Sequence, residues 1–402
     1  MHPNKPIKQL FNANDTWLNF LNKYRETLRT VVIENVTKML ACSTAAFGSK
    51  EYRCSHANCP HHKYIHQTCK SRFCSSCGIK ATEWWIRKQQ HVFPECEYQH
   101  VTLMLPHTLW PIFRDNRFLL NHLFSCAAKI FLGWAKQLDI DIGVLCALHT
   151  YGRKLNWNVH IHLSVTRGGL CKKTGLWKPI FFKAKTTEKC WRTAITQLLC
   201  SNYSELDLSG EDCPFIRNEQ NWSRFLTSQY CRRWKLHFAK KTANVTPTMT
   251  YMGRYLKRPP ISASRLRHDF QGGLVTFDYL NHRNGQTESL ILSPEALIER
   301  MIEHIPDKHF KMIRYFGFLS NRRRGEVPSK VYKALGVAPK DSPEMPGYAA
   351  MLKGYVKVDP FECILCGHRL TFLRFRAGSR CQSWYTMLWL KPKSGQFRHF
   401  TG

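Results

Sequence analysis

Acidic residues are scarce in this sequence. The chain has 28 Asp and Glu residues against 60 Lys and Arg residues, which gives its 402 residues a formal net charge of +32. A protein of this size with such an excess would repel itself strongly unless counterions or a polyanion offset the charge. The composition therefore favours nucleic acid as the partner.

Long apolar runs are also missing. No stretch approaches the roughly eighteen apolar residues that a membrane span needs, and residues 1–10 are polar, unlike a signal peptide. These absences predict a cytoplasmic protein that does not enter the membrane. In a reducing compartment, the 17 cysteines are expected to be core residues, free thiols or metal ligands rather than disulfides.

Cysteine and histidine are concentrated between residues 54 and 77. A tetrahedral Zn²⁺ site needs four sulfur or nitrogen ligands. The simplest set is Cys54, Cys59, Cys74 and Cys77, and the alternative ligands are Cys69, His56, His61, His62 and His66. Four protein ligands leave no open position for chemistry, so the zinc is expected to be structural. Basic residues around the cysteines indicate a DNA-contact module.

A second cysteine pair lies near the C-terminal end of the sequence. Cys363 and Cys366, followed by Gly367, form half of a zinc site. His368 or Cys381 could complete it, and the spacing alone does not decide between a metal site and two free thiols.

The hydrophobic pattern predicts an α+β fold with a central antiparallel sheet and flanking helices. Helices are expected at 15–42 with Asp15 as the cap, and at 81–92, 117–137, 187–200, 219–240, 246–257 and 294–304 with Ser293 as the cap. Strands are expected at 98–106, 143–150, 158–166, 274–279 and 289–292. Residues 325–349 are rich in Gly, Pro and Ser and are interpreted as a linker.

Two histidines lie two residues apart in an apolar strand. His160 and His162 would point to one face, while Val159, Ile161 and Leu163 point to the other. Two neutral imidazoles side by side are half of a divalent-metal site. If the strands at 143–150 and 158–166 form an antiparallel hairpin, His149 would lie near this pair.

Two tyrosines lie four residues apart in the expected helix at 246–257. Tyr251 and Tyr255 would therefore share one helix face. A tyrosine phenolate can attack a phosphodiester and store the bond as a phosphotyrosine, while a divalent ion neutralises charge on a non-bridging oxygen. Two tyrosines can hold two DNA ends at once, which suits strand exchange better than hydrolysis.

At this point the sequence resembles a known family, the two-tyrosine rolling-circle transposases of bacterial insertion sequences, within the HUH endonuclease superfamily. The resemblance covers nearly the whole chain and rests on the cysteines of 54–77, on 149–152 leading to His160 and His162, on 251–255, on 314–321 and on 359–367. It implies that His160 and His162 bind Mg²⁺ or Mn²⁺, and that Tyr251 and Tyr255 are the nucleophiles. The implied substrate is DNA, mainly single-stranded or hairpin element ends that are nicked and rejoined.

One position departs from the family pattern. Relatives often carry a further histidine two positions before the pair, where this chain has Asn158. The third metal ligand is therefore expected to be His149, or else a polar group near the tyrosine helix. The expected division is an N-terminal helical segment (1–48), a zinc module (49–95), the catalytic domain (96–324), and a linker with a cysteine-containing tail (325–402).

Other functions share some of these features. A replication initiator or a conjugative relaxase would have the same metal and tyrosine chemistry, but the zinc module and the absence of a helicase-like phosphate loop favour a transposase. A zinc-stabilised DNA-binding protein without catalysis would share the charge and the cysteines. A carboxylate-cluster nuclease would depend on Asp139 and Asp141, and acidic residues are too sparse to favour it.

Overall fold

The chain folds into two compact units in the computed structural model. The structure describes residues 6–210, 216, 218–243, 246, 249–250, 252–253, 259–268, 273–281, 284–341, 343–344, 347, 349–350, 353–354 and 357–378. One unit combines Met1–Ala81 with Glu344–Gly402, and the other is Thr82–Pro343. This differs from the four consecutive segments expected from the sequence, because a C-terminal strand pairs with an N-terminal one.

The first unit contains a helical part and a small sheet. Its elements are α1 (Pro6–Asn12), α2 (Thr16–Tyr24), α3 (Thr30–Leu40), β1 (Ser49–Cys54), β2 (His62–His66) and β14 (Leu370–Arg376). The sheet has the order β14-β1-β2, with both pairs antiparallel. Strand β14 was not predicted from the sequence. Only its first residue is buried, so the strand lacks the alternation of buried and exposed residues on which the prediction of strands relied.

The single helix expected at 15–42 is two helices. Residues 25–29 interrupt it, and the amides of Thr27 and Leu28 both donate hydrogen bonds to the carbonyl of Tyr24. Asp15 occupies the N-cap position of α2, as predicted, but it lies in the left-handed region at φ 52° and its side chain makes no capping hydrogen bond. The apolar periodicity was nevertheless informative, since Trp17, Phe20 and Val36 are buried.

The second unit is built around a five-stranded antiparallel sheet. Its order is β13-β5-β6-β3-β9. The strands of this sheet are β3 (Tyr98–Met104), β5 (Gly143–Tyr151), β6 (Trp157–Thr166), β9 (Leu236–Phe238) and β13 (Ile313–Gly317). Two smaller sheets are formed by β4 (Ile140–Asp141), β7 (Gly168–Cys171) and β8 (Trp177–Pro179), and by β10 (Leu266–His268), β11 (Val275–Asn281) and β12 (Gln286–Leu292).

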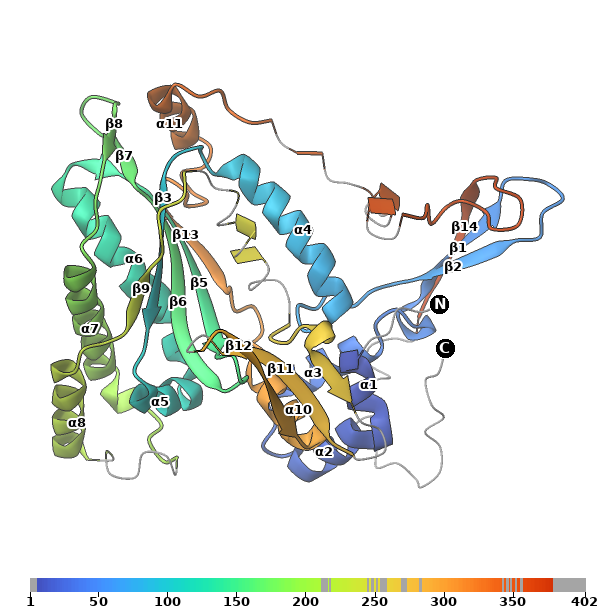
Figure 1. Cartoon of the computed structure of the whole chain (residues 1–402), viewed down its shortest axis with the longest axis horizontal. Coiled ribbons are helices and arrows are strands. Elements are labelled where there is room, and N and C mark those ends of the chain that lie inside the picture. The colour runs from blue at the N-terminus through green and yellow to red at the C-terminus, as the bar shows by residue number, and fades with distance from the viewer. Residues whose placement is uncertain are drawn as a thin grey trace. The chain divides into compact units, whose positions relative to one another are not determined.

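Helices cover both faces of the large sheet (Figure 1). Among the described residues, the helices of this unit include α5 (Trp110–Asp115), α6 (Leu120–Gln137), α7 (Ala184–Ser201), α8 (Glu219–Cys231), α10 (Pro294–Glu303) and α11 (Val327–Leu335), and α4 (Ser75–Val92) leads into it. Val159, Ile161 and Leu163 belong to one buried cluster with residues of α5, α6, α7 and α8. Leu145 and Ala147 belong to a second cluster with Trp85 and Ile86 of α4 on the opposite face. The expected α+β class is confirmed.

Three elements of this unit differ from the sequence-based expectation. Helix α8 ends at Cys231 instead of continuing to 240, and Leu236–Phe238 pairs with β3 as an edge strand. The expected linker contains α11, whose Val331 is fully buried.

The predicted cap at Ser293 is confirmed, because its Oγ accepts a hydrogen bond from the amide of Ala296 at 3.1 Å.

One helix is long and apolar enough to meet the composition test for a membrane span. It covers Arg117–Gln137, and half of it is buried inside the protein. Its buried side chains, among them Leu123, Phe124 and Phe131, pack in the cluster beneath the five-stranded sheet. Core helices pass the same test, and this packing accounts for the apolar character.

The turn between β5 and β6 is fixed by a buried histidine. His304 Nε2 donates to the carbonyl of Leu155 at 3.0 Å, and Thr150 Oγ1 lies 3.2 Å from His304 Nδ1. The imidazole also stacks on Trp157, with ring centroids 5.9 Å apart. Because Leu155 has φ 58°, the turn needs this support to hold a strained residue.

We expect His304→Ala to lower the free energy of unfolding by about 2–3 kcal/mol, because it leaves the Leu155 carbonyl unpaired and removes the stacked ring. Denaturant unfolding measures this change. The control is His122→Ala on the exposed side of α6, which should change stability by less than about 0.5 kcal/mol. Equal effects of the two substitutions would contradict a structural role for His304.

Candidate catalytic site and cysteine clusters

Three histidines meet on one face of the five-stranded sheet. The antiparallel register of β5 and β6 places His149 directly opposite His160, and Ala147 opposite His162. The ring centroid of His149 lies 4.4 Å from that of His162 and 5.3 Å from that of His160. One ring nitrogen from each histidine lies within 4.8 Å of the others. The predicted hairpin is therefore confirmed, and it brings together the three histidines named from the sequence.

Hydrogen bonds fix the orientation of two of these rings. His160 Nδ1 lies 2.9 Å from the carbonyl of Asn158, so this nitrogen carries the proton. His162 Nδ1 lies 3.1 Å from both Thr102 Oγ1 and His100 Nε2. A ring whose Nδ1 is hydrogen-bonded in this way binds a metal through Nε2.

Burial keeps these imidazoles neutral. It lowers the pKa of His160 to about 4, and it lowers the pKa of His162 well below its usual value, helped by repulsion from neighbouring histidines. His100 follows the same trend, with burial lowering its pKa to about 4. Because only a neutral imidazole can bind a cation, His160 and His162 are in their ligating form at neutral pH.

The donor atoms of the cluster fit a divalent cation. Residues 158, 160 and 162 share one face of β6, and the side-chain oxygen of Asn158 is buried without a hydrogen bond from the described residues. Three imidazole nitrogens and an amide oxygen make a mixed donor set. Such a set suits Mn²⁺ better than Mg²⁺, which prefers oxygen ligands.

Tyr251 and Tyr255 lie outside the described residues. Their described neighbours Met249 and Met252 are buried in the cluster that also holds Leu145 and Ala147 of β5, on the histidine-bearing face of the sheet. Gly253 lies so close to α4 that an added Cβ would be 2.6 Å from Ile86 Cγ1. The glycine between the tyrosines therefore allows this segment to approach α4.

The 314–321 motif has a packing role. Arg314 lies over the ring of Phe124 at 4.4 Å, and Tyr315 donates to Gln89 Oε1 at 2.8 Å. Gly317 has φ 61° and faces the Ile142 carbonyl, where a Cβ would clash. The motif thus anchors β13 to the helices on both faces of the sheet.

The two aspartates considered for a carboxylate site do not form one. Asp141 is paired with Arg323 at 2.5 Å, and burial raises the pKa of its carboxyl group. Asp139 occupies a left-handed turn position at φ 51°. Among the described residues, the groups able to hold a metal contain no aspartate or glutamate.

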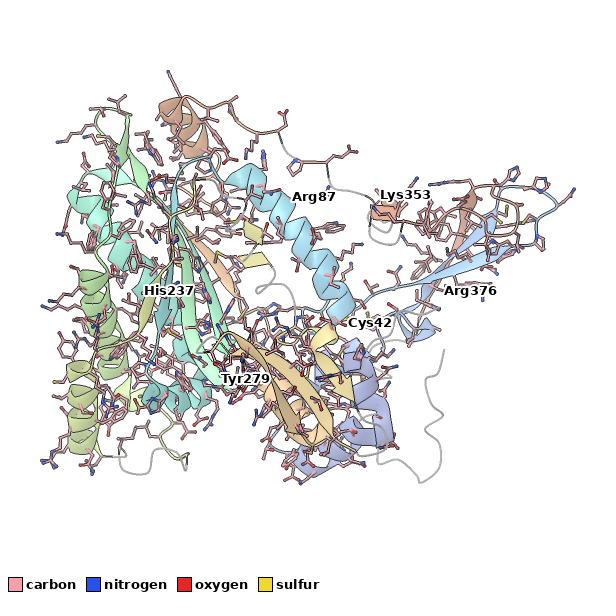
Figure 2. The ribbon with its side chains drawn as sticks, in the orientation of Figure 1. Cys42, Arg87, His237, Tyr279, Lys353 and Arg376 are labelled. Atoms are coloured by element: carbon pink, nitrogen blue, oxygen red, sulfur yellow. The ribbon has the colours of Figure 1, made fainter. Side chains whose placement is uncertain are left out.

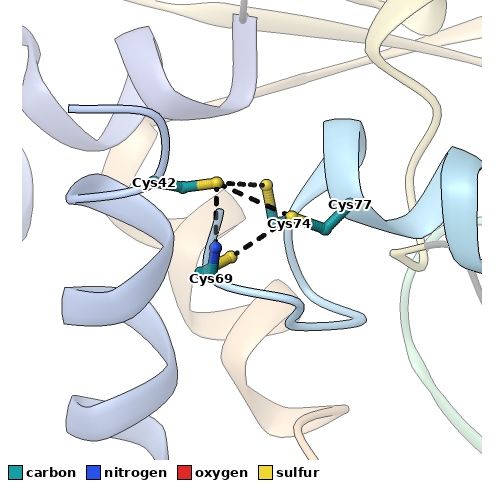
Figure 3. Close-up of side chains that lie close together, drawn as sticks. All are labelled: Cys42, Cys69, Cys74 and Cys77. Carbon is teal, nitrogen blue, oxygen red and sulfur yellow. Dashed lines mark hydrogen bonds between the residues drawn. The ribbon is translucent and has the colours of Figure 1, made fainter. Parts of the chain in front are cut away.

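The four cysteines predicted as one zinc site are divided between two clusters. Cys74 and Cys77 lie with Cys42 and Cys69 (Figure 3), whereas Cys54 and Cys59 lie with Cys363 and Cys366. In the first cluster Cys42 Sγ is 3.6 Å from Cys77 Sγ and 3.7 Å from Cys74 Sγ. Cys69, held as an alternative ligand, is 3.6 Å from Cys77. Cys74 precedes α4 and Cys77 lies in its first turn, where the helix N-terminus stabilises thiolates.

Several residues of the candidate sites were not found from the sequence. Thr102 and His100 lie on one face of β3 and reach His162 from the neighbouring strand. His237 of β9, labelled in Figure 2, lies opposite Thr102 in the register of the sheet. The alternation of polar residues in β3 was the available signal. Cys42 gave no signal in the sequence. It follows the end of the amphipathic helix α3, and no other cysteine lies near it at the spacing of metal ligands.

Comparisons with known proteins identify the class. A family profile described as "Putative transposase" matches residues 143–326, which include the three histidines, and one described as "Transposase zinc-binding domain" matches residues 12–105. The cysteine clusters fit the structural zinc of such a domain.

Two relatives then define the family. The transposase for insertion sequence element IS801 of Pseudomonas savastanoi pv. phaseolicola is 43% identical over 380 residues, which are 94% of this chain and 92% of that protein. "Putative transposase y4qJ" of Sinorhizobium fredii (strain NBRC 101917 / NGR234) is 28% identical over 322 residues, covering 78% of this chain and 80% of that protein. No solved structure is significantly similar. The chain belongs to the family of insertion-sequence transposases that includes the IS801 enzyme, and the resemblance drawn from its motifs is confirmed.

The hydrogen bond between Thr102 and His162 can be tested through metal binding by the histidine cluster. We expect His162→Ala to abolish Mn²⁺ binding, and Thr102→Val to weaken it roughly 10- to 100-fold, as loss of a ligand-orienting contact does elsewhere. Titration followed by electron paramagnetic resonance measures free Mn²⁺ directly. His107→Ala, at an exposed position, is the control. Unchanged affinity in Thr102→Val would show that the hydroxyl does not orient the ligand.

Proposed function

We propose that this transposase nicks single-stranded ends of its element through a covalent tyrosine intermediate and then rejoins them. Tyr251 and Tyr255 are the nucleophiles, and His149, His160 and His162 hold Mg²⁺ or Mn²⁺. The enzyme acts on DNA in the cytoplasm. Family membership supports DNA cleavage and strand transfer, and the tyrosine and metal assignments are the proposal's own.

The residues divide the reaction between them. A tyrosine phenolate attacks the phosphorus, the bond to the displaced sugar oxygen breaks, and that oxygen leaves as a hydroxyl after protonation. His149, His160 and His162 would hold the divalent cation, which would neutralise charge at a non-bridging phosphate oxygen. Thr102 and the Asn158 carbonyl keep His162 and His160 in the ligating orientation. Because the phosphotyrosine conserves the energy of the phosphodiester, rejoining needs no nucleotide cofactor.

The observation that carries this proposal is a shared sheet face. The three histidines lie on the face of β5 and β6 against which Met249 and Met252 are buried. Met252 directly follows Tyr251 in the sequence, and Met249 precedes it by two residues. The position of these methionines supports the proposal that the tyrosines act on the histidine-bearing side of the sheet.

The alternative within the same chemistry is a replication initiator or relaxase. Near full-length similarity to an insertion-sequence transposase favours transposition. A purely DNA-binding role would leave the convergence of three histidines, of which His160 and His162 are neutral and oriented by hydrogen bonds, without a purpose. Formation of a covalent protein–DNA adduct distinguishes a catalytic transposase from a protein that only binds DNA.

Replacing both tyrosines tests the nucleophile. We expect Tyr251→Phe combined with Tyr255→Phe to abolish the protein–DNA adduct with single-stranded element ends, because only the two phenolic oxygens are lost. Each single variant should retain some cleavage and fail in complete strand exchange. Denaturing gels measure the adduct in the presence of Mn²⁺ or a chelator.

The matched control is Tyr203→Phe, which removes a phenolic oxygen beside Trp222, in the cluster on the other face of the sheet. It should form the adduct at the wild-type level. An adduct that persists in the double variant would place the nucleophile elsewhere and refute the assignment.

DNA binding should depend strongly on salt and favour single strands. The net charge of +32 implies many phosphate contacts, and each contact to a single strand contributes a slope of about −0.7 to the dependence of log K on log salt. A tyrosine must reach an exposed phosphate, so single strands and hairpins should bind better than blunt duplex. Fluorescence anisotropy at several salt concentrations measures both effects, and equal affinity for the two forms would argue against the proposed substrate.

A further inference from the structure

The second cysteine cluster joins two loops that are about three hundred residues apart in sequence. Cys54 ends β1 and Cys59 lies in the loop leading to β2, while Cys363 and Cys366 lie in the turn that precedes β14. The loops are held side by side, since the amide of Ser55 donates to the carbonyl of Arg369 at 2.9 Å. The rings of His56 and His368 are 4.7 Å apart between centroids.

The sulfur positions fit a tetrahedral metal site. Cys54 Sγ lies 3.4 Å from Cys366 Sγ, and Cys59 Sγ lies 3.6 Å from Cys363 Sγ. All four sulfur atoms lie within 4.8 Å of one another. Zn–S bonds of about 2.3 Å in a tetrahedron place sulfur atoms roughly 3.8 Å apart, whereas a disulfide requires about 2.05 Å. The geometry is that of four thiolates around one ion and not of two disulfides.

The surroundings of the sulfur atoms suit thiolates. The amide of His56 points at Cys54 Sγ at 3.4 Å, and His61 Nδ1 lies 3.1 Å from Cys363 Sγ. Gly367, at φ 71°, closes the turn, because its amide donates a hydrogen bond to the carbonyl of Cys363 at 2.8 Å. The contacts that His56 and His61 make with sulfur stabilise the negatively charged thiolates and orient them toward the ion.

We propose that Cys54, Cys59, Cys363 and Cys366 bind a second structural zinc ion, separate from the one at Cys42, Cys69, Cys74 and Cys77. The family zinc-binding domain covers residues 12–105 and contains half of these ligands. The C-terminal segment supplies the other half, so this ion ties the two ends of the described chain into one unit. Its four thiolates leave no open position for substrate.

The histidines nearby support the thiolates and are not ligands. His368 Nδ1 lies 3.0 Å from the carbonyl of Cys366, which commits this nitrogen to the backbone. His61 approaches a sulfur atom that already belongs to the tetrahedral group. Cys381, considered from the sequence as a further ligand, lies outside the described residues.

Cobalt substitution of the full-length protein counts the thiolate sites without interference from the histidine site. Thiolate-to-cobalt charge-transfer absorption reports sulfur ligands, whereas imidazole ligands contribute none of it. We expect wild-type protein to show the signal of two tetrathiolate sites, and zinc competition to remove all of it. Cys363→Ser with Cys366→Ser should halve the absorption, and Cys69→Ser with Cys74→Ser should halve it as well.

Two further variants keep the test decisive. Cys200→Ser with Cys231→Ser, at exposed cysteines, should leave the full signal. Cys366→His retains a zinc ligand, so it should hold two metal ions with charge-transfer absorption reduced by one thiolate, even if the Cys363/Cys366 double variant fails to fold. Wild-type protein with the signal of a single tetrathiolate site, or an undiminished signal in the Cys363/Cys366 variant, would overturn the proposal.

Discussion

The register of three neighbouring strands is the constraint on which the candidate site depends. Because side chains alternate along β5, β6 and β3, a single pairing register puts His149 opposite His160 and Thr102 opposite His162. A shift by one residue would send every ligand into the apolar layer below. That layer, filled by Val159, Ile161 and Leu163 against helices, makes such a shift very costly. The hydrophobic core thus sets the geometry of the polar site above it.

The sequence predicted what depends on short-range pattern. The hairpin, the position of His149 and the cap at Ser293 all follow from alternation or from local capping chemistry. The break after Tyr24 and the strand Leu236–Phe238 were missed, because short segments take their structure from the neighbours they pack against. The tyrosine positions were named from the helical spacing and the family motif, and they stay predictions.

Cysteine spacing illustrates the same limit. Cys74 and Cys77 were correctly linked as neighbours, and so were Cys363 and Cys366, since each pair closes one turn. The choice of partners for each pair depends on the fold of the whole unit, which spacing does not encode. A simple count within residues 54–77 therefore merged ligands from two separate groups.

The composite first unit has a consequence for the order in which the protein is made. Strand β1 is the central strand of its sheet, yet its neighbour β14 follows the entire second unit in the chain. During synthesis, β1 leaves the ribosome long before residues 370–376 exist, and its edge on that side stays unpaired until the whole second unit has been translated. A prematurely terminated polypeptide could fold the five-stranded sheet but would lack a finished first unit. Completion of this unit therefore reports that the ribosome has translated the second unit and the strand that follows it.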